Sequence, residues 1–300
     1  MARRKIATNG LSDRYRVSDG RRFRLASIAP DDTGPFVAAN RKEAKRQLGE
    51  HIARIDRLQE KLYAQNQWAL LLVFQAMDAA GKDSVIENVL SGINPQGCEV
   101  HSFKAPSAEE LDHDFLWRCA RRLPERGRIG VFNRSYYEEV LVVRVHPEFL
   151  GKQNLPQKLV GPSLWKERFE DIVSYERYLS RNGFAIRKFF LHVSKAEQKQ
   201  RFLDRLEEPA KNWKFGTADV DERQQFDQYM KCYEEMVRAT ATVQAPWYVV
   251  PADNKWFTRL VVADAIEQAL TGLRLKFPEV GEAQRAVLAQ AKARLLAEKG

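Results

Sequence analysis

Short apolar runs separated by helical patterns set the plan of this chain. The run Ala69–Phe74 is apolar at every position, and similar runs recur at 129–132, 189–193 and 247–250, with a weaker one at 99–103. Runs without alternation suit strands that are buried on both faces, as in a parallel sheet. Strands that alternate with helices form βαβ units. The pattern therefore predicts an α/β fold, a three-layer sandwich with a central parallel sheet of about five strands flanked by helices.

The segments outside these runs have patterns of their own. Residues 1–35 are polar and predict an extended arm with short strand-like pieces such as Arg22–Leu25. Between residues 36 and 65 apolar side chains recur every three or four positions, which predicts an amphipathic helix; they are Leu48, Ile52, Ile55, Leu58 and Leu62. The tail after Pro278 is rich in Ala, Arg and Leu. It predicts a helix that either packs on the domain or joins copies of the chain.

The strongest chemical signal follows the first apolar run. The segment 72–84 leads from a buried strand through small residues to Gly-Lys and an amphipathic stretch. Such a turn points backbone N–H groups at a phosphate, and Lys82 adds a positive charge. The GxxxxGK[ST] pattern is imperfect, because Ala76 replaces the first glycine and Asp83 replaces the hydroxyl residue. A carboxylate must then hold Mg²⁺, and Asp78 is the natural candidate. The other predicted binding positions of this loop are Ala79, Ala80, Gly81, Asp83 and Ser84. The plain alternative is an ordinary strand–turn–helix with Lys82 in solvent.

A second polar cluster begins where the run 129–132 ends. Ligands of open α/β sheets bind at the carboxyl ends of strands. The position that often carries a metal-binding acid holds Asn133, a weaker ligand, so Glu138 or Glu139 would supply the carboxylate. Arg134 is suited to clamp a phosphate with its planar guanidinium. For the glutamates, the alternative is an acidic start to a solvated helix.

Positive charge gathers in two further stretches. Arg118, Arg121 and Arg122 are expected to share a helix face that could follow a polyanion. Arg201 and Arg205 stand one helical turn apart, and Pro209 then precedes a basic loop that contains Lys211 and Lys214. An Arg-rich helix and basic loop at this place in a P-loop kinase would form a lid that closes over phosphates. Taken singly, each cluster is equally well explained as a solvated face.

Composition narrows the class of protein. The formal charge is +9, with 49 Lys and Arg against 40 Asp and Glu, which favours anionic partners. Three separate cysteines indicate reduced thiols of a cytoplasmic protein, and the five histidines lack metal-ligand spacing. No stretch reaches the ~18 apolar residues of a membrane span, and the N-terminus lacks a secretory h-region. No membrane partner is expected.

The motifs together resemble the polyphosphate kinase 2 family from about Tyr15 to Pro278. The matching pieces are 75–84 (QAMDAAGKDS), 92–97 (GINPQG), 102–107 (SFKAPS), 132–138 (FNRSYYE), 212–215 (NWKF) and 245–256 (APWYVVPADNKW). The resemblance implies a P-loop kinase fold like that of thymidylate kinase, with a helical lid, a basic polyphosphate channel and Mg²⁺ or Mn²⁺. It places family roles on Asp78, Lys82, Asn133, Arg134, Arg201 and Arg205, with Asn94, Lys104 and Asp219 as further binding positions.

One departure affects the metal site. Many relatives have Asp where this chain has Asn133, which moves the expected metal ligands to Asp78 and a nearby glutamate, with Glu138 as the candidate. The branch that reads 132–138 as in this chain resembles the one that phosphorylates both AMP and ADP.

These inferences combine into one prediction. We expect a single P-loop phosphotransferase domain over 1–300, with an arm and helix at 1–66, a core at 67–194 and 241–278, a lid at 195–240 and a C-terminal helix at 279–300. It would transfer a terminal phosphoryl group from inorganic polyphosphate to ADP or AMP, bind adenine or guanine nucleotides and form a homo-oligomer, a dimer or tetramer. The alternatives are an ATP-dependent nucleoside monophosphate kinase, a basic nucleic-acid-binding protein and a pseudoenzyme scaffold. No nucleic acid is expected, because no nucleic-acid-binding module is recognisable.

Overall fold

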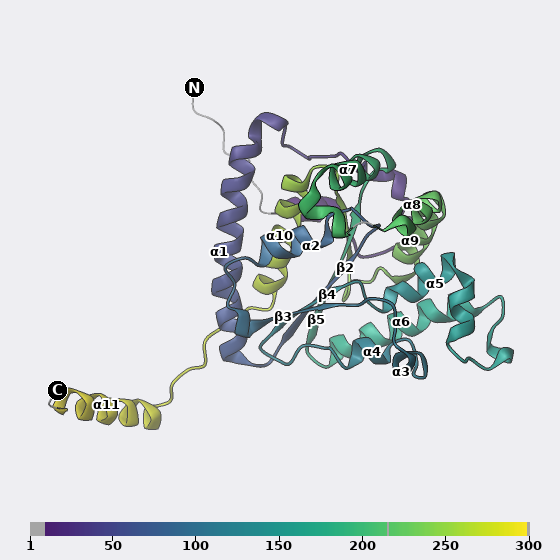
Figure 1. The fold of residues 1–300 in the computed structure, drawn as a ribbon. Coiled ribbons are helices and arrows are strands. Elements are labelled where there is room, and N and C mark those ends of the chain that lie inside the picture. The colour runs from purple at the N-terminus through teal and green to yellow at the C-terminus, as the bar shows by residue number, and fades with distance from the viewer. Residues whose placement is uncertain (1–9, 215, 299–300) are drawn as a thin grey trace.

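A computed structural model describes residues 10–214 and 216–298 and shows a twisted sheet between two layers of helices (Figure 1). The sheet has six strands in the order β1-β6-β5-β2-β4-β3. Five of them are parallel, and β1 pairs antiparallel with β6 at one edge. The strands are β1 (Arg16–Val17), β2 (Ala69–Gln75), β3 (Cys98–Ser102), β4 (Ile129–Asn133), β5 (Phe184–His192) and β6 (Trp247–Pro251). The predicted α/β sandwich and its five parallel strands are confirmed.

Helices cover both faces of the sheet, as the buried strands require. On one face α10 (Lys255–Gly272) packs against β5 and β6 and against α1 (Arg41–Gln65) and α2 (Lys82–Leu90). On the other face α6 (Leu164–Arg181) packs against β5 and α9 (Phe226–Thr240). The predicted stripe on α1 turns inward, with Ile55 and Leu62 buried. The remaining helices of four or more α-helical residues are α3 (Ala108–Leu111), α4 (Trp117–Ala120), α5 (Val142–Val145), α7 (Lys195–Glu207), α8 (Thr217–Gln224) and α11 (Glu282–Ala297).

The chain order places the ends of two strands side by side. The chain runs from β2 through α2 to β3 at one edge and returns as β4, which pairs directly with β2. It then crosses to β5 on the other side of β2. Phe74 stands opposite Asn133 where both strands end. The segments that follow β2 and β4 therefore meet at one edge of the sheet, at the position where such sheets bind ligands.

The N-terminal arm differs from its prediction. The piece Arg22–Leu25 is not a strand: it contains a turn and the start of the short 3₁₀ helix η2 (Leu25–Ser27). The strand of this arm is β1, two residues long, which follows η1 (Leu11–Tyr15). The arm is held by burial of single residues such as Tyr15, 1% exposed. Alternating hydrophobicity could not reveal so short a strand.

The last helix of the predicted lid range packs in the core, whereas the helix of the tail does not. Within the lid range, α9 belongs to the core, because Tyr233, Met236 and Val237 are buried against the sheet layer. The tail forms the predicted helix α11, whose side chains are exposed and which lies away from the body (Figure 1). In the described ranges 10–214 and 216–298 the helices all fall short of the length and apolar character needed to cross a membrane.

Candidate active site at the carboxyl ends of β2 and β4

The loop between β2 and α2 has the shape of a phosphate cradle. Its left-handed turns fall at Ala79 (φ 61°) and Gly81 (φ 101°), whereas Ala76 keeps a negative φ, so alanine is tolerated there without strain. Lys82 opens α2, and its Nζ donates to the carbonyl oxygens of Ala76 at 2.8 Å and Met77 at 3.4 Å. The lysine therefore lies back across the loop, 8% exposed, and does not extend into solvent.

Two side chains of α7 hold three consecutive carbonyl groups of this loop. Gln198 Nε2 donates to the Asp78 carbonyl at 3.1 Å, and Arg201 Nη1 donates to those of Ala79 at 3.1 Å and Ala80 at 2.8 Å. Because a peptide group is planar and trans, a carbonyl turned toward α7 turns the next N–H the other way. The bonds from α7 thus help to aim loop N–H groups into the cradle, which is the geometry that binds phosphate.

Arg201 also ties the loop to the far side of the sheet. Its Nη2 donates to the carbonyl oxygens of Ala252 at 2.5 Å and Asp253 at 3.1 Å, which follow β6, and its Nε donates to Glu197 at 2.7 Å. The side chain is 5% exposed. All its nitrogen atoms therefore serve protein oxygens, so the structure places Arg201 beneath the cradle as a clasp between two loops.

Arg134 links the loop to the segment after β4. Its Nη2 donates to Asp78 Oδ1 at 2.7 Å, and its Nη1 lies 3.6 Å from Glu138 Oε2. The three side chains are between a quarter and two fifths exposed, so they remain accessible to a ligand. One guanidinium thus holds two carboxylates from different strand ends.

The pKa values of the two carboxylates in this cluster shift in opposite directions. Burial alone would raise the pKa of Asp78, but the positive charges of Lys82 and Arg134 outweigh it and lower that pKa. For Glu138 burial prevails and raises the pKa, although Arg134 and Lys82 oppose it. The pKa of Lys82 is lowered by burial and by repulsion from Arg134. The pKa of Arg134 is raised, chiefly by attraction to Glu138, so its charge is permanent.

The two glutamates that follow β4 have different partners. Glu139 is 5% exposed, accepts a hydrogen bond from Gln153 Nε2 at 2.8 Å and pairs with Arg168 at 3.3 Å. It joins the segment after β4 to α6 and the loop before it. Glu138, by contrast, pairs with Arg134. Glu138 is therefore the glutamate that could serve a metal beside Asp78.

Two more predicted residues support the walls of the cradle. Asn133 Nδ2 donates to Asp83 Oδ1 at 2.6 Å, which joins the end of β4 to the start of α2. Ser84 Oγ accepts a hydrogen bond from Arg259 Nη2 of α10 at 2.7 Å. Asn133 thus carries no carboxylate to a metal, and it fixes the first turn of α2 instead.

A cavity of about 330 Å³ opens on the other side of Arg134 and Glu138. Its walls are largely apolar and include Phe103, Leu111, Phe115, Val142, Val143 and Phe149. Arg118 lies in it, 12% exposed, held by the Lys104 carbonyl at 2.7 Å and by Glu110 at 3.4 Å. Apolar walls with a few fixed charges are typical of a site for a flat organic group that bears an anion.

Only some of the remaining predicted residues lie at this site. The three arginines around α4 do not share one surface, because that helix is a single turn. Arg118 enters the cavity, whereas Arg121 lies over the Trp117 ring and is 60% exposed. Arg122 is exposed as well. Asn94 is exposed, and its side chain accepts from the Gln96 backbone N–H. Arg205 acts electrostatically on Asp78. The side chains of Lys211, Lys214 and Asp219 lie outside the described residues.

Sequence reasoning missed several residues of the site. Gln198 lies one turn before Arg201, but a glutamine on a helix surface gave no signal. Tyr229 and Tyr233 of α9 lie near Asp78 and Glu138, and both phenols have a raised pKa, chiefly because of burial. Their spacing on one helix face was readable. Gln75, a fully buried polar residue that ends an apolar strand, was visible in the sequence too.

Comparison with known proteins identifies the family. Residues 38–277 match the family model for polyphosphate kinase 2. The chain is 51% identical to an ADP-polyphosphate phosphotransferase of Rhodopseudomonas palustris over 94% of this chain and 97% of that protein. It is 42% identical to an AMP/ADP-polyphosphate phosphotransferase of Meiothermus ruber over 89% and 95%. The crystal structure of a polyphosphate kinase 2 from Arthrobacter aurescens superposes with a TM-score of 0.84 at 36% identity, covering 95% of this chain and 98% of that one. The chain therefore belongs to the polyphosphate kinase 2 family.

Proposed function

We propose that this protein transfers the terminal phosphoryl group of inorganic polyphosphate to ADP, AMP or both. One observation supports this most directly: Arg134 lines the apolar cavity and also bonds Asp78 of the P-loop. A polyanion on the loop and a nucleotide in the cavity would then present their phosphates to the same guanidinium. The relatives named for this reaction support the assignment of substrates.

The nucleotide would take the cavity, and polyphosphate would take the P-loop. The apolar walls around Phe103 and Phe115 suit a purine ring, and Arg118 and Lys104 suit its phosphates. The N–H groups of the loop, aimed by the clasp from α7, suit the terminal phosphates of the donor. Adenine and guanine both fit this description.

The carboxylates fit a divalent cation, Mg²⁺ or Mn²⁺. Asp78 and Glu138 share Arg134 and offer hard oxygen ligands, which Mg²⁺ prefers along with phosphate oxygens and water. Gln75 is fully buried next to Glu138, and neither of its amide atoms has a hydrogen bond of normal geometry among the described residues. Waters around a cation would satisfy that amide. When bound, the cation would neutralise phosphate charge.

The protein's own groups would do the rest by position and charge. Phosphoryl transfer needs little covalent help from the enzyme, because most catalysis comes from alignment and from stabilising charge on the transferred group. Lys82 and Arg134 would surround that group, and Arg205 would approach from α7. The acceptor is already an anionic phosphate, so no strong general base is required. Arg201 would act through the loop that it holds.

A direct assay tests the proposal. Purified protein is incubated with Mg²⁺ and polyphosphate, together with ADP or AMP and without added ATP, and the nucleotides are separated by chromatography. We expect ATP from ADP, or ADP from AMP, with loss of polyphosphate. Phosphorylation of AMP that depends on added ATP and ignores polyphosphate would instead favour a nucleoside monophosphate kinase. Absence of both reactions, with tight salt-sensitive binding of duplex DNA, would favour the nucleic-acid-binding alternative.

A further inference from the structure

The backbone at Arg134 is held in a conformation that a side chain resists. Arg134 has φ 65°, in the left-handed region that favours glycine, and its N–H donates to the Phe74 carbonyl at 3.0 Å. Such a residue persists only where its surroundings hold it, and strained backbone of this kind gathers at functional sites. One hydrogen bond to β2 fixes the start of the turn. Something must also fix the residues that follow.

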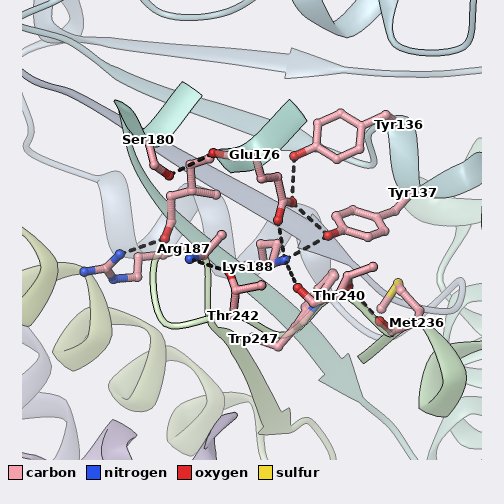
Figure 2. A network of polar contacts seen from close by, with 12 residues as sticks. Tyr136, Tyr137, Glu176, Ser180, Arg187, Lys188, Met236, Thr240, Thr242 and Trp247 are labelled. Carbon is pink, nitrogen blue, oxygen red and sulfur yellow. Dashed lines mark hydrogen bonds and ion pairs between the residues drawn. The ribbon is translucent and has the colours of Figure 1, made fainter. Parts of the chain in front are cut away.

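The next residues are anchored on one buried carboxylate (Figure 2). Tyr136 and Tyr137 are 2% and 0% exposed, and their phenol groups donate to Glu176 Oε1 at 2.9 and 2.8 Å. Glu176 lies on α6 and is 1% exposed. These tyrosines stand between Arg134 and Glu138 in the chain, so the anchored stretch is the one that carries these two residues of the site.

A buried lysine completes the network. Lys188 of β5 is fully buried, and its Nζ donates to Glu176 Oε2 at 2.6 Å, to Tyr137 Oη at 2.8 Å and to the Thr240 carbonyl at 2.8 Å. The three donors of the ammonium are thus all used. Trp247 Nε1 donates to Thr240 Oγ1 at 2.9 Å, which joins β6 and the end of α9 to the same point. The turn, α6, β5, α9 and β6 therefore all meet at one ion pair (Figure 2).

Stability alone does not explain a charge pair in this place. Burial disfavours the charge of Lys188 and lowers its pKa, and Glu176 opposes that effect. Buried pairs of this kind are often matched or exceeded in stability by apolar residues of similar size, because taking both charges out of water is costly. Apolar packing does not fix the orientation of a side chain in the way that a hydrogen bond does. Each phenol is held where its O–H group meets the carboxylate.

Resting on the proposed function, we propose that Glu176 and Lys188 are positioning residues for phosphoryl transfer. Through Tyr136 and Tyr137 they fix the turn that carries Arg134 and Glu138, and they keep the Arg134 guanidinium on Asp78. Neither charged residue touches substrate. A shift of about 1 Å in a positioned group can lower a rate by about a hundredfold. The network would therefore affect kcat without contacting substrate.

Removal of the ion pair together with both phenol groups tests this. The variant Tyr136→Phe/Tyr137→Phe/Glu176→Leu/Lys188→Met leaves no side-chain charge or phenol unpaired at this point. We expect it to fold, with kcat for ADP reduced at least about tenfold and KM changed by less than about threefold. Tyr137→Phe, which breaks two bonds and keeps the ring, should lower kcat in the same direction. Normal kcat in the folded Tyr137→Phe protein would overturn the proposal.

A matched control separates positioning from loss of stability. Glu267→Gln weakens another partly buried cluster, in which Glu267 pairs with His51 and Arg54 of α1, far along the chain from the turn. It should lower the melting temperature and leave kcat unchanged. A crystal structure of Tyr137→Phe supplies a readout that does not depend on activity: the 2.7 Å bond from Arg134 to Asp78 should be lengthened or lost. If that bond is intact, the positioning role is wrong. If the wild type makes no product from polyphosphate, it is the proposed function that fails.

Discussion

Replacement of Arg201 by lysine should weaken the fold as well as the reaction. The guanidinium joins two loops at once, since Nη1 serves Ala79 and Ala80 and Nη2 serves Ala252 and Asp253. Lysine keeps the positive charge but has one nitrogen at the end of a flexible stem, so it can serve one of these loops at a time. The carbonyl groups of the other loop would lose their partners inside the protein.

The size of the effect follows from the number of carbonyl groups left unpaired. A buried polar group without a partner costs about 1–3 kcal/mol. With two carbonyls abandoned, one of them only part-buried, Arg201→Lys should lower the free energy of unfolding by about 2–4 kcal/mol. In a chain of this size that corresponds to a fall in Tm of about 5–10 °C. Because the loop carbonyls also orient the cradle, kcat should fall as well.

Two measurements on the same samples decide the matter. Urea unfolding followed by circular dichroism gives the stability, and ATP release from ADP and polyphosphate gives kcat. Arg238→Lys on α9, in an exposed pair with Glu234, is the matched control and should change neither. A variant with wild-type stability and a strongly reduced kcat would refute the clasp. It would support the direct contact with phosphate that the sequence pattern suggested for Arg201.

Three further substitutions test the site. Lys82→Met should retain the fold, because methionine fills the same space, and lower kcat at least about a hundredfold in the ATP-release assay. Arg118→Met should raise KM for the nucleotide about tenfold or more with a smaller change in kcat, because it removes a charge from the cavity and leaves the P-loop intact. Glu138→Gln acts through pH: the raised pKa of Glu138 means that folding favours its neutral form, so stability is lost as pH rises through that pKa. The variant should therefore melt above the wild type at about pH 8 and level with it at about pH 4. The acid limb of its residual kcat/KM should move to lower pH, because Asp78, whose pKa is lowered, is the carboxylate that remains. If Glu138→Gln and the wild type melt at equal temperatures at both pH values, or if the acid limb is unchanged, the assignment of Glu138 is wrong. If Arg118→Met has a normal KM, the assignment of Arg118 to the nucleotide is wrong.

The sequence by itself determined the local structure and the chemistry of the loop. Uninterrupted apolar runs predicted four of the five parallel strands, because strand segments that are buried on both faces are mostly apolar. The edge strand β3, which contains Glu99 and His101, gave only a weak signal. The small residues before Gly81 and Lys82 predicted the phosphate-binding loop, because a tight turn into a helix N-terminus needs residues of this kind. The antiparallel strand of the arm escaped notice, since two residues are too few to show a period.

Only the tertiary structure decided which polar side chains meet. Glu138 and Glu139 are neighbours in sequence, yet one pairs with Arg134 and the other with Arg168 of α6. Arg201 had the spacing of a lid residue, but the packing of α7 against the loop directs its guanidinium to carbonyl oxygens. The contact of Tyr137 with Lys188 joins residues 51 positions apart. Such contacts depend on the order of strands in the sheet, which no local pattern of hydrophobic and polar residues contains.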